Sequence, residues 1–97
     1  MNTMESMYET IDKELISSLS FPENDVLDDD KEAILQRQND LNRALALGNL
    51  EHLKIKIYFE DDKSKKVVDT TIWGLTDERI ILKQGVVIPI KRIYKTI

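Results

Sequence analysis

The sequence predicts an α+β fold, in which two N-terminal helices precede a five-stranded antiparallel sheet that bends into a small barrel. Over residues 3–47, apolar side chains recur every three or four positions, which is the period of one helix face. From residue 52 they alternate with polar side chains, as in a strand that is buried on one face. Turns rich in Gly, Asp and Ser divide this second half into short segments, which favours antiparallel pairing.

The first helix is expected over residues 3–19, followed by an acidic linker over residues 22–29. Asn2 or Thr3 is placed to cap this helix, and Pro22 stops it because the residue before a proline avoids the helical conformation. One face of the helix carries six apolar residues: Met4, Met7, Tyr8, Ile11, Leu15 and Leu19. Residues 1–29 are therefore expected to cap the domain formed by residues 30–97 or to contact a partner.

The second helix is expected over residues 30–47, with Ile34, Leu41 and Leu45 on its apolar stripe. The three aspartates at residues 28–30 lack the glycine and the distal glutamate of a calcium-binding loop, so we expect them to cap this helix. Gly48 is expected to end the helix, because glycine adopts the left-handed conformation without a penalty from a Cβ atom.

Five strands are expected over residues 53–59, 65–73, 79–83, 86–90 and 93–97. Gly74 allows the second strand to bend, and the pair Gln84-Gly85 indicates a tight hairpin. Pro89 has no N–H and therefore belongs at a sheet edge or a strand break. A sheet of this size avoids exposed edges best by closing partly into a barrel.

A helix followed by five strands, the second of them bent at Gly74, resembles the Sm-like and SH3-like class of small β-barrels over residues 31–97. Bacterial relatives in the Sm-like class include the RNA chaperone host-factor family and the small antitermination inhibitors that bind Rho. The resemblance implies a small barrel that binds protein or RNA, and it supplies no motif that assigns site residues.

A second resemblance is local. Residues 75–85 read LTDERIILKQG, and residues 88–93 read IPIKRI. This pattern is similar to the core of bacterial pleckstrin-homology-like domains, which use more strands and a closing C-terminal helix. The likeness is confined to residues 75–93 and carries over no functional residue.

Composition excludes several kinds of chemistry. The absence of cysteine excludes disulfides and thiolate ligands, and His52 is the one histidine among 97 residues. The sequence has no glycine-rich phosphate loop and no GxSxG motif. Carboxylate pairs such as Asp61-Asp62 and Asp77-Glu78 fall in expected turns, where solvated acids are ordinary. We therefore expect no catalytic residues, no cofactor and no metal site.

Location is inferred from the same sequence. No apolar run approaches the length of about 18 residues that spans a bilayer. The first ten residues lack the basic stretch and apolar block of a secretory signal. A cytoplasmic protein without membrane contact is the expectation.

The net charge of −4 divides unevenly, with −7 over residues 1–49 and +3 over residues 50–97. Lys54, Lys56 and Tyr58 share the outward face of the first strand, and Trp73 offers a ring on which a base could stack. A basic face that binds RNA is therefore one functional hypothesis.

The competing hypothesis is a protein-interaction module. The strand at residues 86–88 lies beside Pro89 and is a candidate sheet edge to which a partner adds a strand. We favour a non-catalytic adaptor or regulatory module that self-associates or binds another protein, with RNA binding as the alternative. The candidate binding residues are Lys54, Lys56, Trp73, Ile88, Lys91 and Arg92.

Overall fold

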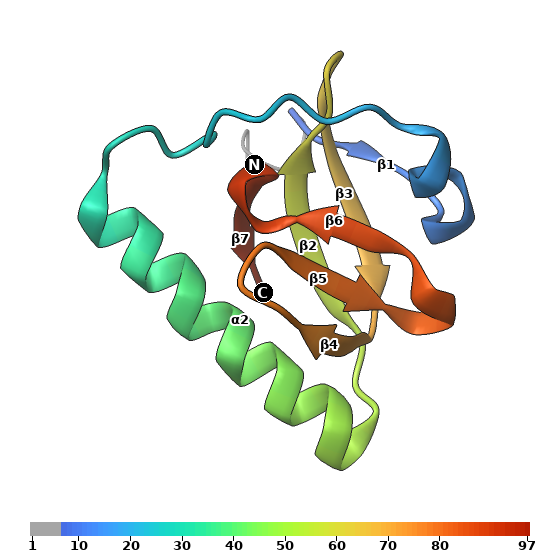
Figure 1. Ribbon diagram of the computed structural model, residues 1–97. Coiled ribbons are helices and arrows are strands. Elements are labelled where there is room, and N and C mark those ends of the chain that lie inside the picture. The colour runs from blue at the N-terminus through green and yellow to red at the C-terminus, as the bar shows by residue number, and fades with distance from the viewer. Residues whose placement is uncertain (1–6) are drawn as a thin grey trace.

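The structure is a computed structural model that describes residues 7–97 (Figure 1). This part of the chain forms a small α+β domain with one α-helix, short 3-10 helices and seven strands. In chain order the elements are β1 (Glu9–Thr10), η1 (Lys13–Ser18), α2 (Lys31–Glu51), β2 (Ile55–Glu60), β3 (Lys65–Thr70), β4 (Ile72–Leu75), β5 (Arg79–Leu82), η2 (Lys83–Gly85), β6 (Val87–Pro89), η3 (Ile90–Arg92) and β7 (Ile93–Thr96).

The helix predicted over residues 3–19 is wrong for the part that is described, and residues 3–6 lie outside the described residues. Residues 7–19 instead form the two-residue strand β1, which pairs in parallel with β3, and the 3-10 helix η1. Tertiary contacts override the helical period here: Tyr8 packs edge-on against Tyr58, and Ile16 is buried in the core.

The second predicted helix is confirmed as α2, but it runs on to Glu51. The side chain of Asp30 accepts a hydrogen bond from the backbone N–H of Ala33 at 3.1 Å, so this aspartate caps the helix as expected. Gly48 does not end α2. His52 takes the left-handed conformation after the last turn, with φ 56°. Gly48 lies against β4, where a Cβ atom would be 2.5 Å from the carbonyl oxygen of Ile72.

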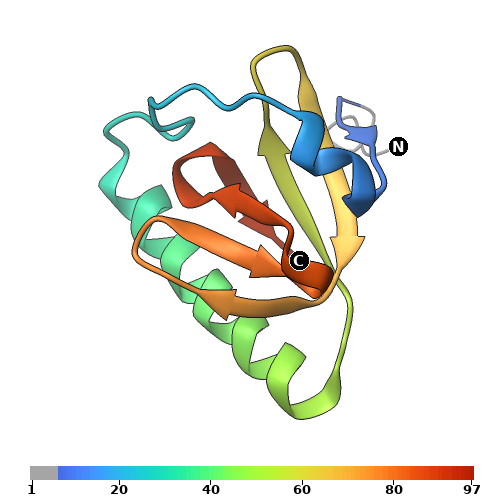
Figure 2. The same ribbon diagram turned by 45° about the vertical axis from the view of Figure 1, so that its right-hand side comes forward.

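Strands occupy each segment where alternation predicts one, but they do not close into a barrel. They form a four-stranded sheet in the order β1-β3-β2-β7 and a three-stranded sheet in the order β4-β5-β6. The predicted strand over residues 65–73 breaks at Thr71, which sends β4 into the second sheet. The predicted fold of two helices and a five-stranded barrel is therefore corrected to one long helix and two separate sheets (Figure 2).

The core lies between the two sheets and α2. It contains Ile16, Leu41, Ala44, Ile55, Ile57, Phe59, Val68, Ile72, Ile80, Leu82, Ile88, Ile90 and Ile93. Figure 1 shows α2 along one side of the sheets and β1 at the opposite side, next to β3. No helix in the described part of the chain is long and apolar enough to cross a membrane.

The segment predicted as an acidic linker is tied to this body. Arg37 on α2 donates to both carboxylate oxygens of Asp25 at 2.8 Å. The backbone N–H of Val26 donates to the carbonyl oxygen of Lys91 at 2.8 Å. Residues 19–30 therefore cross the molecule as an anchored strap before α2 begins (Figure 2).

Candidate interaction surface

The outward face of the β4-β5-β6 sheet carries apolar side chains beside one charged residue, Arg79. Ile80, Leu82 and Ile88 are fully buried, so they define the inward face of this sheet. Side chains alternate along a strand, which places Ile81 and Val87 on the outward face, directly opposite each other. A sheet with one solvated face normally carries polar residues there.

Trp73 adds an aromatic ring to this face. The pairing of β4 with β5 shifts from Ile72↔Leu82 to Gly74↔Ile81, so Trp73 is the extra residue of a β-bulge. Ile72 is buried, and Trp73 points the opposite way with 54 % of its surface exposed. A bulge aims a side chain away from the regular ladder, and this one presents a tryptophan to solvent.

Ile81 packs against Gly74, the residue that follows the tryptophan. A Cβ atom on Gly74 would lie 3.2 Å from Cδ1 of Ile81, so the Ile81 side chain packs over the glycine. On the next strand, Val87 keeps 40 % of its surface exposed. We refer to Trp73, Ile81 and Val87 as the outer patch.

The structure separates the other predicted binding residues. Lys54 and Lys56 are exposed near the start of β2, and Lys91 is exposed on η3. Ile88 is fully buried in the core. Alternation along residues 86–88 places Val86 and Ile88 on one face and Val87 on the other, and the structure has the first pair facing the core.

Arg92 is also buried, with 4 % of its surface exposed. Its guanidinium donates to the carbonyl oxygens of Asn24, Glu60 and Asp61 at 2.9 to 3.4 Å. The arginine therefore holds the strap against the end of β2, and its charge is not offered to a ligand. Of the four basic candidates, Lys54, Lys56 and Lys91 are exposed and Arg92 is not.

The tyrosines of the first sheet are covered. Tyr8 and Tyr58 have ring centroids 4.8 Å apart, and Tyr8 and Tyr94 have centroids 6.0 Å apart. Lys95 lies over the Tyr58 ring and Lys65 over the Tyr94 ring. Burial, together with the hydrogen bond that the Tyr94 hydroxyl donates to Glu60, raises the pKa of Tyr94. Tyr58 was expected to face outward with Lys54 and Lys56, but Tyr8 covers it.

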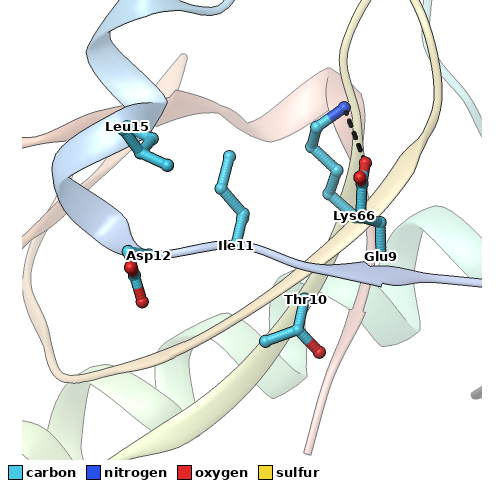
Figure 3. A pocket seen from close by; sticks show the side chains of 6 residues that line it. All are labelled: Glu9, Thr10, Ile11, Asp12, Leu15 and Lys66. Atoms are coloured by element: carbon cyan, nitrogen blue, oxygen red, sulfur yellow. Dashed lines mark ion pairs between the residues drawn. The ribbon is translucent and has the colours of Figure 1, made fainter.

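A small pocket beside β1 contains a buried lysine (Figure 3). The Lys66 ammonium donates to Asp61 at 3.1 Å and to the Ser64 hydroxyl at 2.6 Å, and Glu9 lies 3.6 Å away. Burial would raise the pKa of Asp61, but hydrogen bonds from the backbone of Ser64 and from Lys66 outweigh it and lower that pKa. This network joins β1 to the β2–β3 turn and leaves Lys66 fully engaged.

A larger groove runs between the strap, the first half of α2 and β6, with a volume of about 890 Å³. Its apolar lining includes Leu19, Phe21, Ile34, Val86 and Ile90. Among the described residues, no group of three His, Cys, Asp or Glu side chains could hold a metal ion. Comparisons of the chain with protein-family models, with curated proteins and with solved structures found no match.

Proposed function

We propose that this protein is a non-catalytic protein-binding module, an adaptor or regulatory protein, that contacts its partner through the outer patch. The exposed Trp73 on its bulge is the observation that carries this proposal. Buried tryptophans dominate the binding energy of many interfaces, and a bulge fixes this one before binding. Ile81 and Val87 supply apolar surface beside it.

A protein partner fits this surface better than RNA does. Binding to nucleic acid gains most of its affinity from clustered basic residues near exposed rings. Here Arg92, Tyr8 and Tyr58 are buried, and the chain carries a net charge of −4. Lys56 lies on β2, in a different sheet from Trp73, and Lys54 directly precedes β2.

The test is a quantitative pull-down from native lysate with tagged wild type, Trp73→Ala and Leu35→Ala, measuring protein and RNA in the same eluate. Leu35 is the matched control, because it is 63 % exposed and lies on α2 rather than on the outer patch. We expect one stoichiometric protein partner with wild type and with Leu35→Ala. Loss of a hot-spot tryptophan should lower its affinity by about 30-fold.

Two outcomes would overturn the proposal. In the first, Trp73→Ala retains the partner as well as wild type does. In the second, RNA is enriched at physiological salt without a stoichiometric protein and is lost in a Lys54→Ala, Lys56→Ala double variant. The second result would assign the function to the basic residues at the start of β2.

A further inference from the structure

The groove beside β6 is lined by backbone N–H and carbonyl groups of β6 that form no hydrogen bond with β5. The backbone N–H of Leu82 donates to Val86, and that of Ile90 donates to Glu78. The pairs Leu82–Val86, Ile80–Ile88 and Glu78–Ile90 are therefore the hydrogen-bonded pairs of the antiparallel ladder between β5 and β6. The residues between them, Val87 and Pro89, therefore direct their backbone groups away from β5.

This free edge of β6 is short and has a defined pattern. Val87 offers one N–H donor and one carbonyl acceptor, and Pro89 offers a carbonyl alone because proline has no N–H. Proline on an edge limits indiscriminate strand pairing. The edge therefore accepts an added strand in one register, centred on Val87.

Arg37 also lines the groove, but its guanidinium is buried in the wall. Its two terminal nitrogens bind Asp25 and the carbonyl oxygen of Ile93. Its Nε atom is buried and has no acceptor among the described residues. An atom without accessible surface is out of reach of a ligand in the groove, so Arg37 shapes the groove wall and the hydrogen bonds to a ligand must come from β6.

We propose that the groove binds an extended peptide segment of a protein partner, which adds as a strand to β6. A peptide backbone presents alternating N–H and carbonyl groups, which match the donor and acceptors of Val87 and Pro89. Alternate side chains of the peptide contact the apolar lining at Leu19 and Phe21.

Charge at the groove selects among such peptides. Glu23 and Asp77 are exposed in the groove lining and have no ion pair with other described residues. Lys91 is likewise exposed in the lining and has no ion pair with other described residues, so the groove presents charges of both signs. A segment with apolar residues at its centre and charges of both signs is therefore favoured over a uniformly acidic one. The groove is a second binding surface, and the proposal for it does not depend on whether the outer patch binds a partner. The side chain of Val87 belongs to the outer patch, whereas its backbone N–H and carbonyl groups face the groove.

The experiment selects binders from a phage-displayed library of random nine-residue peptides on the full-length protein and measures their affinity by fluorescence polarisation. Val87→Pro removes the outward N–H, and the extended Val86, with ψ 138°, accommodates a following proline. Val87→Thr is the matched control, because it keeps the N–H and the side-chain shape. We expect Val87→Pro to weaken binding by about tenfold or more, and Val87→Thr by less than about twofold.

A second pair of variants keeps the test decisive if Val87→Pro does not fold. Ser17 lines the groove and Ser18 does not, although both are exposed on η1. Ser17→Trp should obstruct the groove and abolish binding, whereas Ser18→Trp should bind as wild type does.

Failure to select any peptide above background, or selected peptides that ignore Ser17→Trp, would overturn the inference. Trp73→Ala should leave peptide affinity unchanged. The pull-down with Trp73→Ala therefore tests the outer patch, and the peptide affinities test the groove.

Discussion

Asp25 and Arg37 show how a single ion pair anchors the strap to α2. The carboxylate and the guanidinium form two hydrogen bonds of 2.8 Å, and Arg37 is almost fully buried. Burial alone would raise the pKa of Asp25, but hydrogen bonds from Arg37 and from the Leu27 backbone, with the charge of Arg37, lower it below its ordinary value of 3.8. A carboxylate with a lowered pKa stabilises the fold while it is ionised.

We predict that the free energy of unfolding falls as the pH drops below about 4, the pKa of an unfolded aspartate, and through the lower folded pKa of Asp25. Above that window the contribution of this carboxylate is fully present. Asp25→Asn should cost about 3 kcal/mol at neutral pH, because it leaves the Arg37 charge buried without a counter-ion. Urea unfolding between pH 3 and pH 6 measures both effects.

Asp29→Asn is the control for this prediction, because Asp29 is exposed and makes no ion pair with other described residues. Its free energy of unfolding should match that of wild type at neutral pH. Equal stability of Asp25→Asn and wild type at neutral pH would show that the pair does not anchor the strap.

At the scale of the element, α2 and β4 approach closely at Gly48. The glycine is buried inside the helix, and any Cβ atom there would meet the Ile72 carbonyl oxygen and the Thr71 side chain. A glycine near the end of an apolar stripe is the usual sign of a helix stop, which is why the sequence predicts one here. Here the glycine stays helical, and its missing side chain lets α2 pack closely against β4.

Gly48→Ala is therefore expected to destabilise the protein by about 1–3 kcal/mol through overpacking, even though alanine is the better helix former. Asn49→Ala, one position further along and exposed, should be neutral or slightly stabilising. Thermal unfolding followed by circular dichroism compares the two. A Gly48→Ala variant as stable as wild type would mean that α2 moves away from β4 without cost.

At the scale of the whole molecule, the N-terminal segment is part of the core rather than an independent helix. The sequence leaves open whether this segment caps the domain or contacts a partner, and two neighbouring residues of η1 allow a test. Ile16 is fully buried in the core cluster, and Leu15 is 55 % exposed. If η1 contributes to folding, the two leucine-sized side chains must differ greatly in their effect on stability.

We predict that Ile16→Ala lowers the free energy of unfolding by about 2–4 kcal/mol, whereas Leu15→Ala changes it by less than about 0.5 kcal/mol. Chemical denaturation measures both variants. Equal and small effects would indicate that the segment only lies on the surface. In that case its apolar residues would be free to contact a partner.

The sequence by itself determined the local elements of this protein. The helical period and the Asp30 cap located α2, although the helix runs beyond its predicted end. The pattern of residues 53–97 located the strands that follow and their antiparallel neighbours, except that it predicted β3 and β4 as one strand. It also identified Trp73 as a candidate contact. These features depend on neighbours along the chain, which a single sequence contains.

Only the tertiary structure decided how these elements combine. The break at Thr71 divides the strands between two sheets, the bulge turns Trp73 outward, and Tyr8 with Ile16 draws the N-terminal segment out of a helix. Periodicity states which side of an element is apolar, but not which distant residues will cover it. The fold and the candidate surfaces depend on that pairing, because burial energy is gained only where two apolar faces meet.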